Sequence, residues 1–410
     1  MPLGNRSICR RAYGPAVVLI AVAACFSVVT LSAAPVSSAA AVRGPNLVKG
    51  SAYLISPANL IGGHYYESFP HVADFGLTID GALALAATGD DDQALRKIVA
   101  FIDSDGKDAS GKTVNDWTGI GTPYASAGAI GKEALLAEVV GGNPRSFGGH
   151  NLIAALDASV CVRASTGADT SCPAAGSYLN ATSVFDQALG IIAQLRAGQA
   201  AKAGPAIAYL ESLQNSDGSF FSLIPRGGGP DVDSTAMAAM ALALAPGNAA
   251  AEDVSLSLGW IARQQDKNGG FPGAGGDSVN SAGLAIQALT LRSARYQSRV
   301  DAARAFLRRE QDPGGGFNAD AGGQQGSNLR ASTQAVGGSV GTSFGTLRRD
   351  LSRQLAGADH SSDTHAVGRN VLLGFAVIVA LAVVALLMRR RRSNSPATGA
   401  RTGAHPRVRS

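Results

Sequence analysis

The chain has 410 residues, of which 46% are hydrophobic and 16% are charged, and its formal net charge is +5. The basic excess belongs to the two ends, where residues 1–40 hold 3 arginines and residues 389–410 hold 7. Without these, 25 basic residues remain against 30 acidic ones, so the rest of the chain is acidic. A protein that binds nucleic acid concentrates positive charge on its folded surface. The charge balance excludes that class, and we predict no nucleic-acid binding.

The N-terminal segment is typical of an export signal. Arginines at positions 6, 10 and 11 precede an apolar stretch of residues 15–31, and small residues follow up to position 41. A charged, then apolar, then small-residue order is that of a secretory signal, which is removed after export. We therefore predict a signal peptide over residues 1–41.

Residues 42–345 repeat themselves about every fifty positions. Three copies of the pattern Gln-x-x-x-Gly-[Gly/Ser]-Phe end at Phe220, Phe271 and Phe317, and each is followed by a Gly-rich stretch and an Ala-rich segment that opens with small polar residues. Fainter upstream copies align through leucines at positions 83, 135 and 189, and the series continues at 242 and 289. With the last copy, at Ser332, the sequence predicts six units of a repeat architecture.

Each unit is predicted to hold two helices. An amphipathic helix, for example residues 251–265, precedes the Gly-Phe turn, and a small apolar helix, for example residues 234–244, follows it. Glycine permits the positive-φ turn between the two. Because the second helix is rich in Ala, Gly and Ser, its copies can approach closely around a common axis. The expected fold is all-α, an α/α toroid (barrel) of about six helical hairpins.

The four cysteines divide between the signal and the exported domain. Cys9 and Cys25 lie in the predicted signal, which leaves Cys161 and Cys172, 11 positions apart, in the mature domain. An exported pair that brackets a polar loop predicts a disulfide. A metal site is the weaker interpretation because no second Cys or His pair lies nearby. We expect no metal and no cofactor.

The C-terminal part predicts a membrane anchor. A Gly- and Ser-containing stalk of residues 346–370 leads to residues 371–388, which carry no charge, and then to four consecutive arginines at the start of residues 389–410. A stretch of this length can span a bilayer as a helix, and arginines favour the cytoplasmic side. The sequence thus predicts a bacterial single-pass protein of the cell membrane, with its ectodomain outside and a basic cytoplasmic tail.

The repeats resemble those of the α/α-toroid superfamily, strongly over residues 205–345 and weakly over residues 65–200. That group includes squalene and class II diterpene cyclases, protein prenyltransferase β subunits, and vitamin B12 carriers of the intrinsic factor and transcobalamin type. The resemblance implies the toroid fold and says much less about activity. The carriers complete their corrin pocket with a small β domain, and no strand-rich segment follows residue 345 here.

One motif carries a specific chemical expectation. The run from Asp231 to Ala236 resembles the cyclase motif Asp-x-Asp-Asp-Thr-Ala, whose middle aspartate protonates a polyprenyl double bond. The resemblance implies that Asp233 is a general acid with Asp231 beside it, although Ser234 replaces the last aspartate. The alternative is that Asp233 is a helix N-cap, as Asn280 is in the next copy. A prenyltransferase zinc site is not expected, because no Cys follows Asp233.

Two functions of different class stay open. The preferred one is a surface receptor or scaffold that binds a bulky ligand or protein partner at the barrel mouth formed by the starts of the small helices. The residues expected to bind, through hydrogen bonds rather than chemistry, are Asp80, Asp186, Asp231, Asp233, Thr235, Asn280 and Ser332. The alternative is a terpene-cyclase-like or prenyltransferase-like enzyme with Asp233 as its general acid.

Overall fold

The computed structural model describes residues 44–351 apart from positions 168, 274 and 324. The predicted signal peptide, transmembrane helix and basic tail lie outside these residues, as does the predicted stalk from position 352 onward. Within the described part of the chain, no helix is both long enough and apolar enough to cross a membrane.

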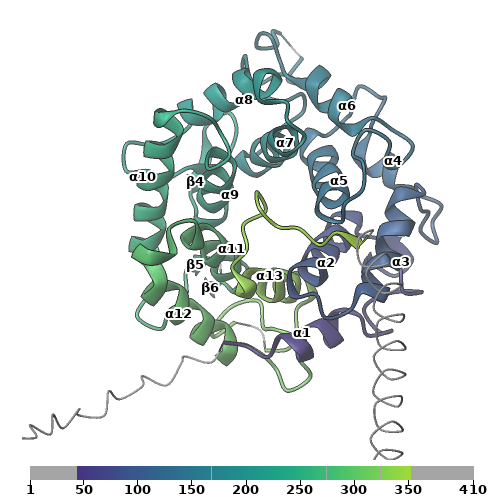
Figure 1. The fold of residues 1–410 in the computed structure, drawn as a ribbon, viewed down its shortest axis with the longest axis vertical. Coiled ribbons are helices and arrows are strands. Elements are labelled where there is room, and N and C mark those ends of the chain that lie inside the picture. The colour runs from purple at the N-terminus through teal and green to yellow at the C-terminus, as the bar shows by residue number, and fades with distance from the viewer. Residues whose placement is uncertain (1–43, 168, 274, 324, 352–410) are drawn as a thin grey trace, which may run out of the picture. The chain divides into compact units, whose positions relative to one another are not determined.

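The described residues form two concentric rings of helices (Figure 1). The inner ring consists of α2 (Phe75–Thr88), α5 (Ala127–Val139), α7 (Val184–Arg196), α9 (Val232–Leu242), α11 (Val279–Leu289) and α13 (Leu329–Val340). The outer ring consists of α1 (Leu47–Leu54), α3 (Asp92–Asp103), α6 (Leu152–Ser159), α8 (Ala200–Ser212), α10 (Asn248–Gln264) and α12 (Ser293–Arg309). Each inner helix contacts the next, and α13 contacts α2, so the ring is closed.

The predicted α/α toroid of six helical hairpins is confirmed. The leucines that revealed the repeat, at positions 83, 135, 189, 242 and 289, all lie in inner helices. The helix starts, however, differ from the expected ones. The N-caps of α9 and α11 are Asp231 and Ser278, so Asp233 and Asn280 lie in the first helical turn and are not caps.

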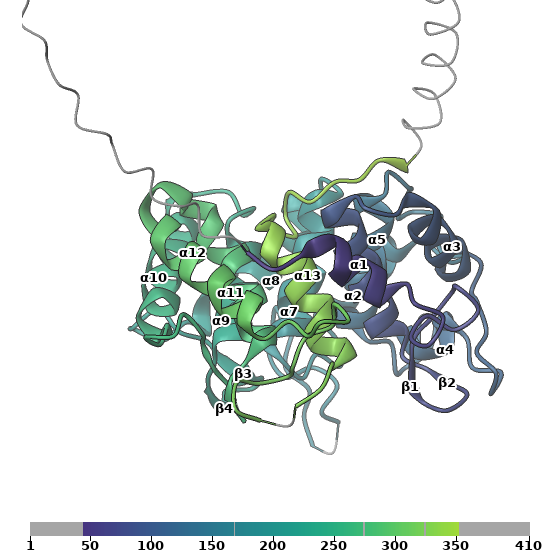
Figure 2. The ribbon, with the colours of Figure 1, turned by 90° about the horizontal axis from the view of Figure 1, so that it is seen from below.

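Short antiparallel hairpins precede three inner helices. They are β1 (Glu67–Phe69) with β2 (Val72–Ala73), β3 (Phe221–Leu223) with β4 (Gly227–Pro230), and β5 (Pro272–Gly273) with β6 (Gly276–Asp277). The two short helical segments are α4 (Val114–Thr118) and the 3-10 helix η1 (Thr290–Arg292). Figure 2 shows β1–β4 on one face of the ring, whereas the chain reaches Leu351 on the opposite face.

A buried hydroxyl explains why two of the three helices that follow a Gly-Phe turn carry Thr or Ser in their first turn. The Thr235 hydroxyl accepts the Phe220 N–H at 3.0 Å and donates to the Asp231 carbonyl at 2.7 Å. The Ser332 hydroxyl accepts the Phe317 N–H at 2.9 Å in the same way. The hydroxyl therefore fixes the turn against the helix in these two repeats.

We expect Thr235→Val to lower the free energy of unfolding by about 1–3 kcal/mol, since it leaves the buried Phe220 N–H without an acceptor. Ser332→Ala is the matched change in the last repeat and should give a loss of the same order. Thermal unfolding of both variants checks the prediction, and two variants with the wild-type midpoint would contradict it.

The motif glutamine links each repeat to the next. The side-chain amide of Gln265 donates to the Arg299 carbonyl in α12 at 2.8 Å, and that of Gln311 donates to the Asn46 carbonyl, just before α1, at 2.9 Å. The second contact joins the last repeat to the first. The predicted disulfide is also confirmed: Cys161 and Cys172 are bonded in the loop between α6 and α7.

Candidate functional site

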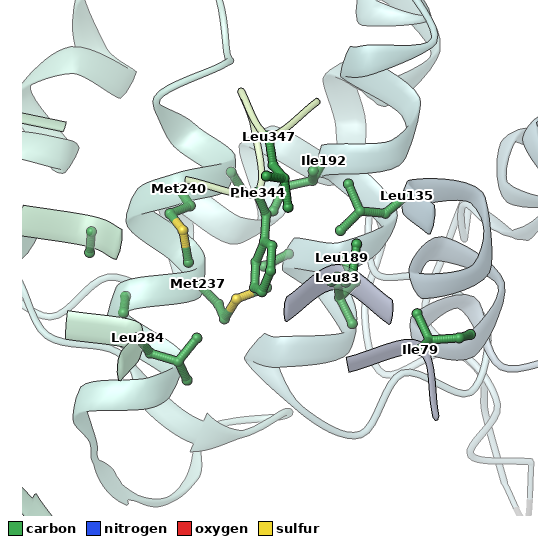
Figure 3. Close-up of a cluster of buried hydrophobic side chains, with 14 of the residues drawn as sticks. Ile79, Leu83, Leu135, Leu189, Ile192, Met237, Met240, Leu284, Phe344 and Leu347 are labelled. Atoms are coloured by element: carbon green, nitrogen blue, oxygen red, sulfur yellow. The ribbon is translucent and has the colours of Figure 1, made fainter. Parts of the chain in front are cut away.

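The inner ring encloses an apolar layer at mid-height. Figure 3 shows side chains from several inner helices that point to the axis, among them Leu83, Leu135, Leu189, Met237 and Leu284. All five are buried. The inner helices are mainly Ala, Leu and Gly, which leaves this layer without a stack of aromatic rings from the helices themselves.

The chain fills the axis with its own C-terminal segment. Residues 342–351, here named the strap, run across the C-terminal ends of the inner helices, and Phe344 and Leu347 lie among the axial side chains (Figure 3). Leu351 is also buried. The strap packs with the toroid, so the stalk does not begin at position 346.

A buried arginine anchors the middle of the strap, while Gln287 and Arg96 bind the carbonyls of its end residues Thr342 and Leu351. The Arg196 side chain is 2% exposed and lies 3.1 Å from the Glu138 carboxylate. Its guanidinium donates to the carbonyls of Phe344 and Gly345 at 2.9 Å and to that of Leu347 at 3.1 Å. Burial raises the pKa of Glu138 to about 7, against the opposing effect of Arg196. The C-terminal ends of α5 and α7 thus supply a buried anchor for the strap.

A polar layer lies at the other mouth, where the inner helices begin. Asp233 and Asn280 stand four residues before Met237 and Leu284, on the same helix faces, and the Asn280 amide donates to Asp233 Oδ2 at 2.6 Å. The polar layer therefore lies one helical turn above the apolar one. It spans α9 and α11, which are neighbours in the ring.

Two carboxylates of this layer are incompletely satisfied. Asp231 Oδ1 accepts the Ser234 N–H at 2.9 Å, while Asp231 Oδ2 and Asp233 Oδ1 are buried and accept no hydrogen bond. Burial raises the pKa of Asp233 to about 6, reinforced by the charge of Asp231, although the Ser281 hydroxyl and the Asn280 amide oppose the shift. Near neutral pH the pair consequently carries negative charge in a poorly solvated place.

The remaining predicted residues are spread around the ring. Asp80 pairs with Lys132 of α5 at 2.9 Å. Asp186 accepts hydrogen bonds from the Thr182 N–H and hydroxyl, both at 3.3 Å, at the start of α7. Thr235 and Ser332 are buried, and their hydroxyls are engaged with backbone groups. The structure thus brings Asp231, Asp233 and Asn280 together and gives the two hydroxyls a role within the repeat.

Sequence reasoning missed the residues that occupy the axis. Phe344 and Leu347 lie in a Gly-, Ser- and Thr-containing segment without helical periodicity, and no sequence signal showed that they turn back into the ring. Lys132, the partner of Asp80, was also missed. Its spacing of three residues before Leu135 could have placed it on the axial face.

A metal centre finds no support in the described part of the chain. Within it, no three His, Cys, Asp or Glu side chains are arranged to hold a metal ion. The acidic pair at the start of α9 has an amide, from Asn280, as its neighbour. The chemistry that this arrangement offers is hydrogen bonding and charge pairing, or proton donation by Asp233.

Residues 173–319 and 246–338 match the family model of the prenyltransferase alpha-alpha toroid domain. No curated protein matches the chain. Among solved structures, a variant of the type II terpene cyclase MstE from Scytonema, in complex with geranylgeranyl dihydroxybenzoate, is 15% identical with a TM-score of 0.51, over 74% of this chain and 97% of that one. The resemblance to the α/α-toroid superfamily is confirmed.

Glycoside hydrolases of the same fold are equally similar. The GH76 α-mannanase BT2949 of Bacteroides thetaiotaomicron is 13% identical with a TM-score of 0.53, over 73% of this chain and 94% of that one. An inactive α-1,6-mannanase of Salegentibacter, in complex with α-1,6-mannotriose, is 9% identical with a TM-score of 0.50, over 73% and 98% of the two chains. At these identities the likeness shows the fold alone.

Proposed function

We propose that this chain is a membrane-anchored extracytoplasmic α/α-toroid domain that binds a bulky ligand or a protein partner at the mouth formed by the starts of its inner helices. The observation that carries the proposal is the strap. Phe344 and Leu347 occupy the axis of the ring, so a ligand would bind at the polar mouth rather than along the axis. The residues that offer contacts there are Asp231, Asp233 and Asn280.

The direction of the mouth agrees with a role at the cell surface. The described chain ends at Leu351, on the face opposite to the hairpins that precede α2 and α9 (Figure 2). If residues 371–388 span the membrane, as their composition predicts, the strap face is the one nearer the anchor.

The test is native mass spectrometry of the full chain released in detergent from its own host's membrane. We expect a discrete added mass or a co-purified protein on the wild type, and its loss when Asp233 and Asn280 are both changed to alanine. Asp301→Ala, in α12 of the outer ring, is the matched control and should retain it. A ligand that stays bound to the double variant would overturn the proposal.

A second candidate function is supported by one observation, the state of Asp233. A terpene-cyclase-like enzyme needs a carboxylic acid that is protonated and aimed at an apolar cavity, and Asp233 has a raised pKa and a buried, unpartnered Oδ1 above Met237. This function requires that the strap leave the axis. Turnover of a polyprenyl substrate, enhanced by Phe344→Ala and abolished by Asp233→Asn, would establish it, and no turnover in any of these forms would exclude it.

A further inference from the structure

The polar mouth is electrostatically uneven. On the side of α2, α5 and α13, carboxylates have cationic partners, since Asp80 pairs with Lys132 and Asp74 pairs with Arg330, each at 2.9 Å. On the side of α7 and α9, none of the ion pairs found among the described residues includes Asp231 or Asp233. Asp186, at the start of α7, is in none of them either, so the carboxylates without an ion pair on this side are Asp186, Asp231 and Asp233.

The two free carboxylate oxygens there indicate what is missing. Asp231 Oδ2 and Asp233 Oδ1 belong to residues two positions apart, and both atoms are buried without a hydrogen-bond donor. A carboxylate oxygen can only accept, so the group that satisfies it must carry an N–H or O–H. A buried charged acceptor left without a hydrogen bond costs more free energy than a neutral acceptor left without one. A positively charged donor would satisfy both oxygens and neutralise the pair at once.

We infer that the acidic side of the mouth binds a cationic nitrogen group, an ammonium or a guanidinium, carried by the ligand or the partner. The inference rests on the proposed function and specifies its ligand. The cation lies between Asp231 and Asp233. Asn280 donates to Asp233 Oδ2 and so holds that carboxylate in position.

Two exposed side chains, Tyr124 and Leu223, lie in the segments that lead into α5 and α9. Tyr124 is 84% exposed. The carbonyls on either side of it, those of Pro123 and Ala125, accept hydrogen bonds from the Asn180 amide, which ties this loop to the segment that leads into α7. Leu223, also exposed, pairs with Ser183, the N-cap of α7. An exposed aromatic ring and an exposed apolar side chain in these loops suit the stem and charge of a lysine- or arginine-like group.

The experiment is isothermal titration of the full chain in lipid nanodiscs with three ligands: agmatine, a tripeptide Gly-Arg-Gly blocked at both ends, and neutral α-1,6-mannotriose. We expect one or both cations to bind and mannotriose not to bind. The double change Asp231→Asn and Asp233→Asn should weaken cation binding by about tenfold or more. Asparagine also caps helices well, so α9 should still form, and Asp301→Asn should bind as the wild type does.

The pH dependence provides a second readout. Below the raised pKa of Asp233, about 6, protonation removes one of the two charges, so cation binding should be weaker at pH 5 than at pH 7.5. The groups that shift this carboxyl are Asp231, which favours protonation, and Ser281 and Asn280, which oppose it. Binding that is independent of pH over this range would contradict the inference.

The remaining outcomes separate the inference from the proposed function. If the bound ligand is neutral or anionic and is lost when Asp233 and Asn280 are changed to alanine, the inference of a cationic group is wrong. The mouth then still stands as the binding site. The inference of a cationic group is also wrong if neither cation binds at millimolar concentration, or if the double asparagine variant retains the binding. Binding of the peptide but not agmatine would identify a protein partner as the source of the group, and the reverse would identify a free amine.

Discussion

Arg196→Met is expected to lower the free energy of unfolding by about 3–5 kcal/mol, because it removes one partner of a buried ion pair. The Glu138 carboxylate is then left in a poorly solvated place, and the carbonyls of Phe344, Gly345 and Leu347 lose their donor. Urea unfolding of the full chain in detergent measures the loss. The strap should also become accessible to trypsin at Arg348 and Arg349.

Arg304→Met is the matched control for this prediction. Arg304 donates to the carbonyls of Ser339 and Val340 at the end of α13, at 2.9 and 3.1 Å, but it has no buried carboxylate partner and is less buried than Arg196. The loss should be about 1–2 kcal/mol, in the range of ordinary hydrogen bonds. Equal losses in the two variants would show that the ion pair, and with it the strap anchor, has no special role.

Glu133→Gln is expected to stabilise the protein at alkaline pH. Glu133, in α5, is fully buried and neither of its side-chain oxygens has a hydrogen-bond partner. Burial, with the charges of Asp105 and Asp103, raises its pKa from 4.5 to about 8. The folded protein therefore holds a proton on this group that the unfolded chain releases above pH 4.5, so its contribution to stability falls as the pH rises from 4.5 to 8.

The size and sign of this effect can be measured by comparing urea unfolding of the wild type and Glu133→Gln at pH 5 and pH 8.5. Near pH 5 the two should differ little. At pH 8.5 the variant should be the more stable by about 3–5 kcal/mol, since glutamine cannot ionise. Glu252→Gln, on the exposed face of α10, should show no such divergence. Parallel pH profiles for the wild type and Glu133→Gln would refute the assignment.

The ring of hairpins was predictable because it depends on a period. Leu83, Leu135 and Leu189 recur at a spacing that survives even where the Gly-Phe turn is faint, and a repeated unit needs only its register to be recognised. The disulfide was predictable for a different reason, since Cys161 and Cys172 were the only candidates left in the predicted ectodomain. Local signals of this kind are contained in the sequence itself.

The filling of the axis was not predictable, because it depends on contacts across the whole ring. Phe344 meets Met237 and Met240, more than a hundred positions earlier, and Arg196 reaches Phe344 and Leu347 from α7. Helix capping was misplaced by two residues because Asp231 and Asp233 are both good caps. The cap that forms is the one whose carboxylate reaches the Ser234 N–H.

Closure of the ring distinguishes this domain from an open array of repeats. In an open array the terminal units fray first, and stability is the sum of the units and their interfaces. Here the last unit contacts the first, through α13 on α2 and through Gln311 on Asn46. Five units without the sixth would leave the faces of α2 and α11 that α13 covers exposed to solvent. A partly folded ring is therefore disfavoured, and we expect unfolding in a single cooperative step. A nascent chain cannot complete this interface until α13 has been synthesised, and truncation before Leu329 should affect α1 and α2, which lie more than 240 residues earlier in the chain.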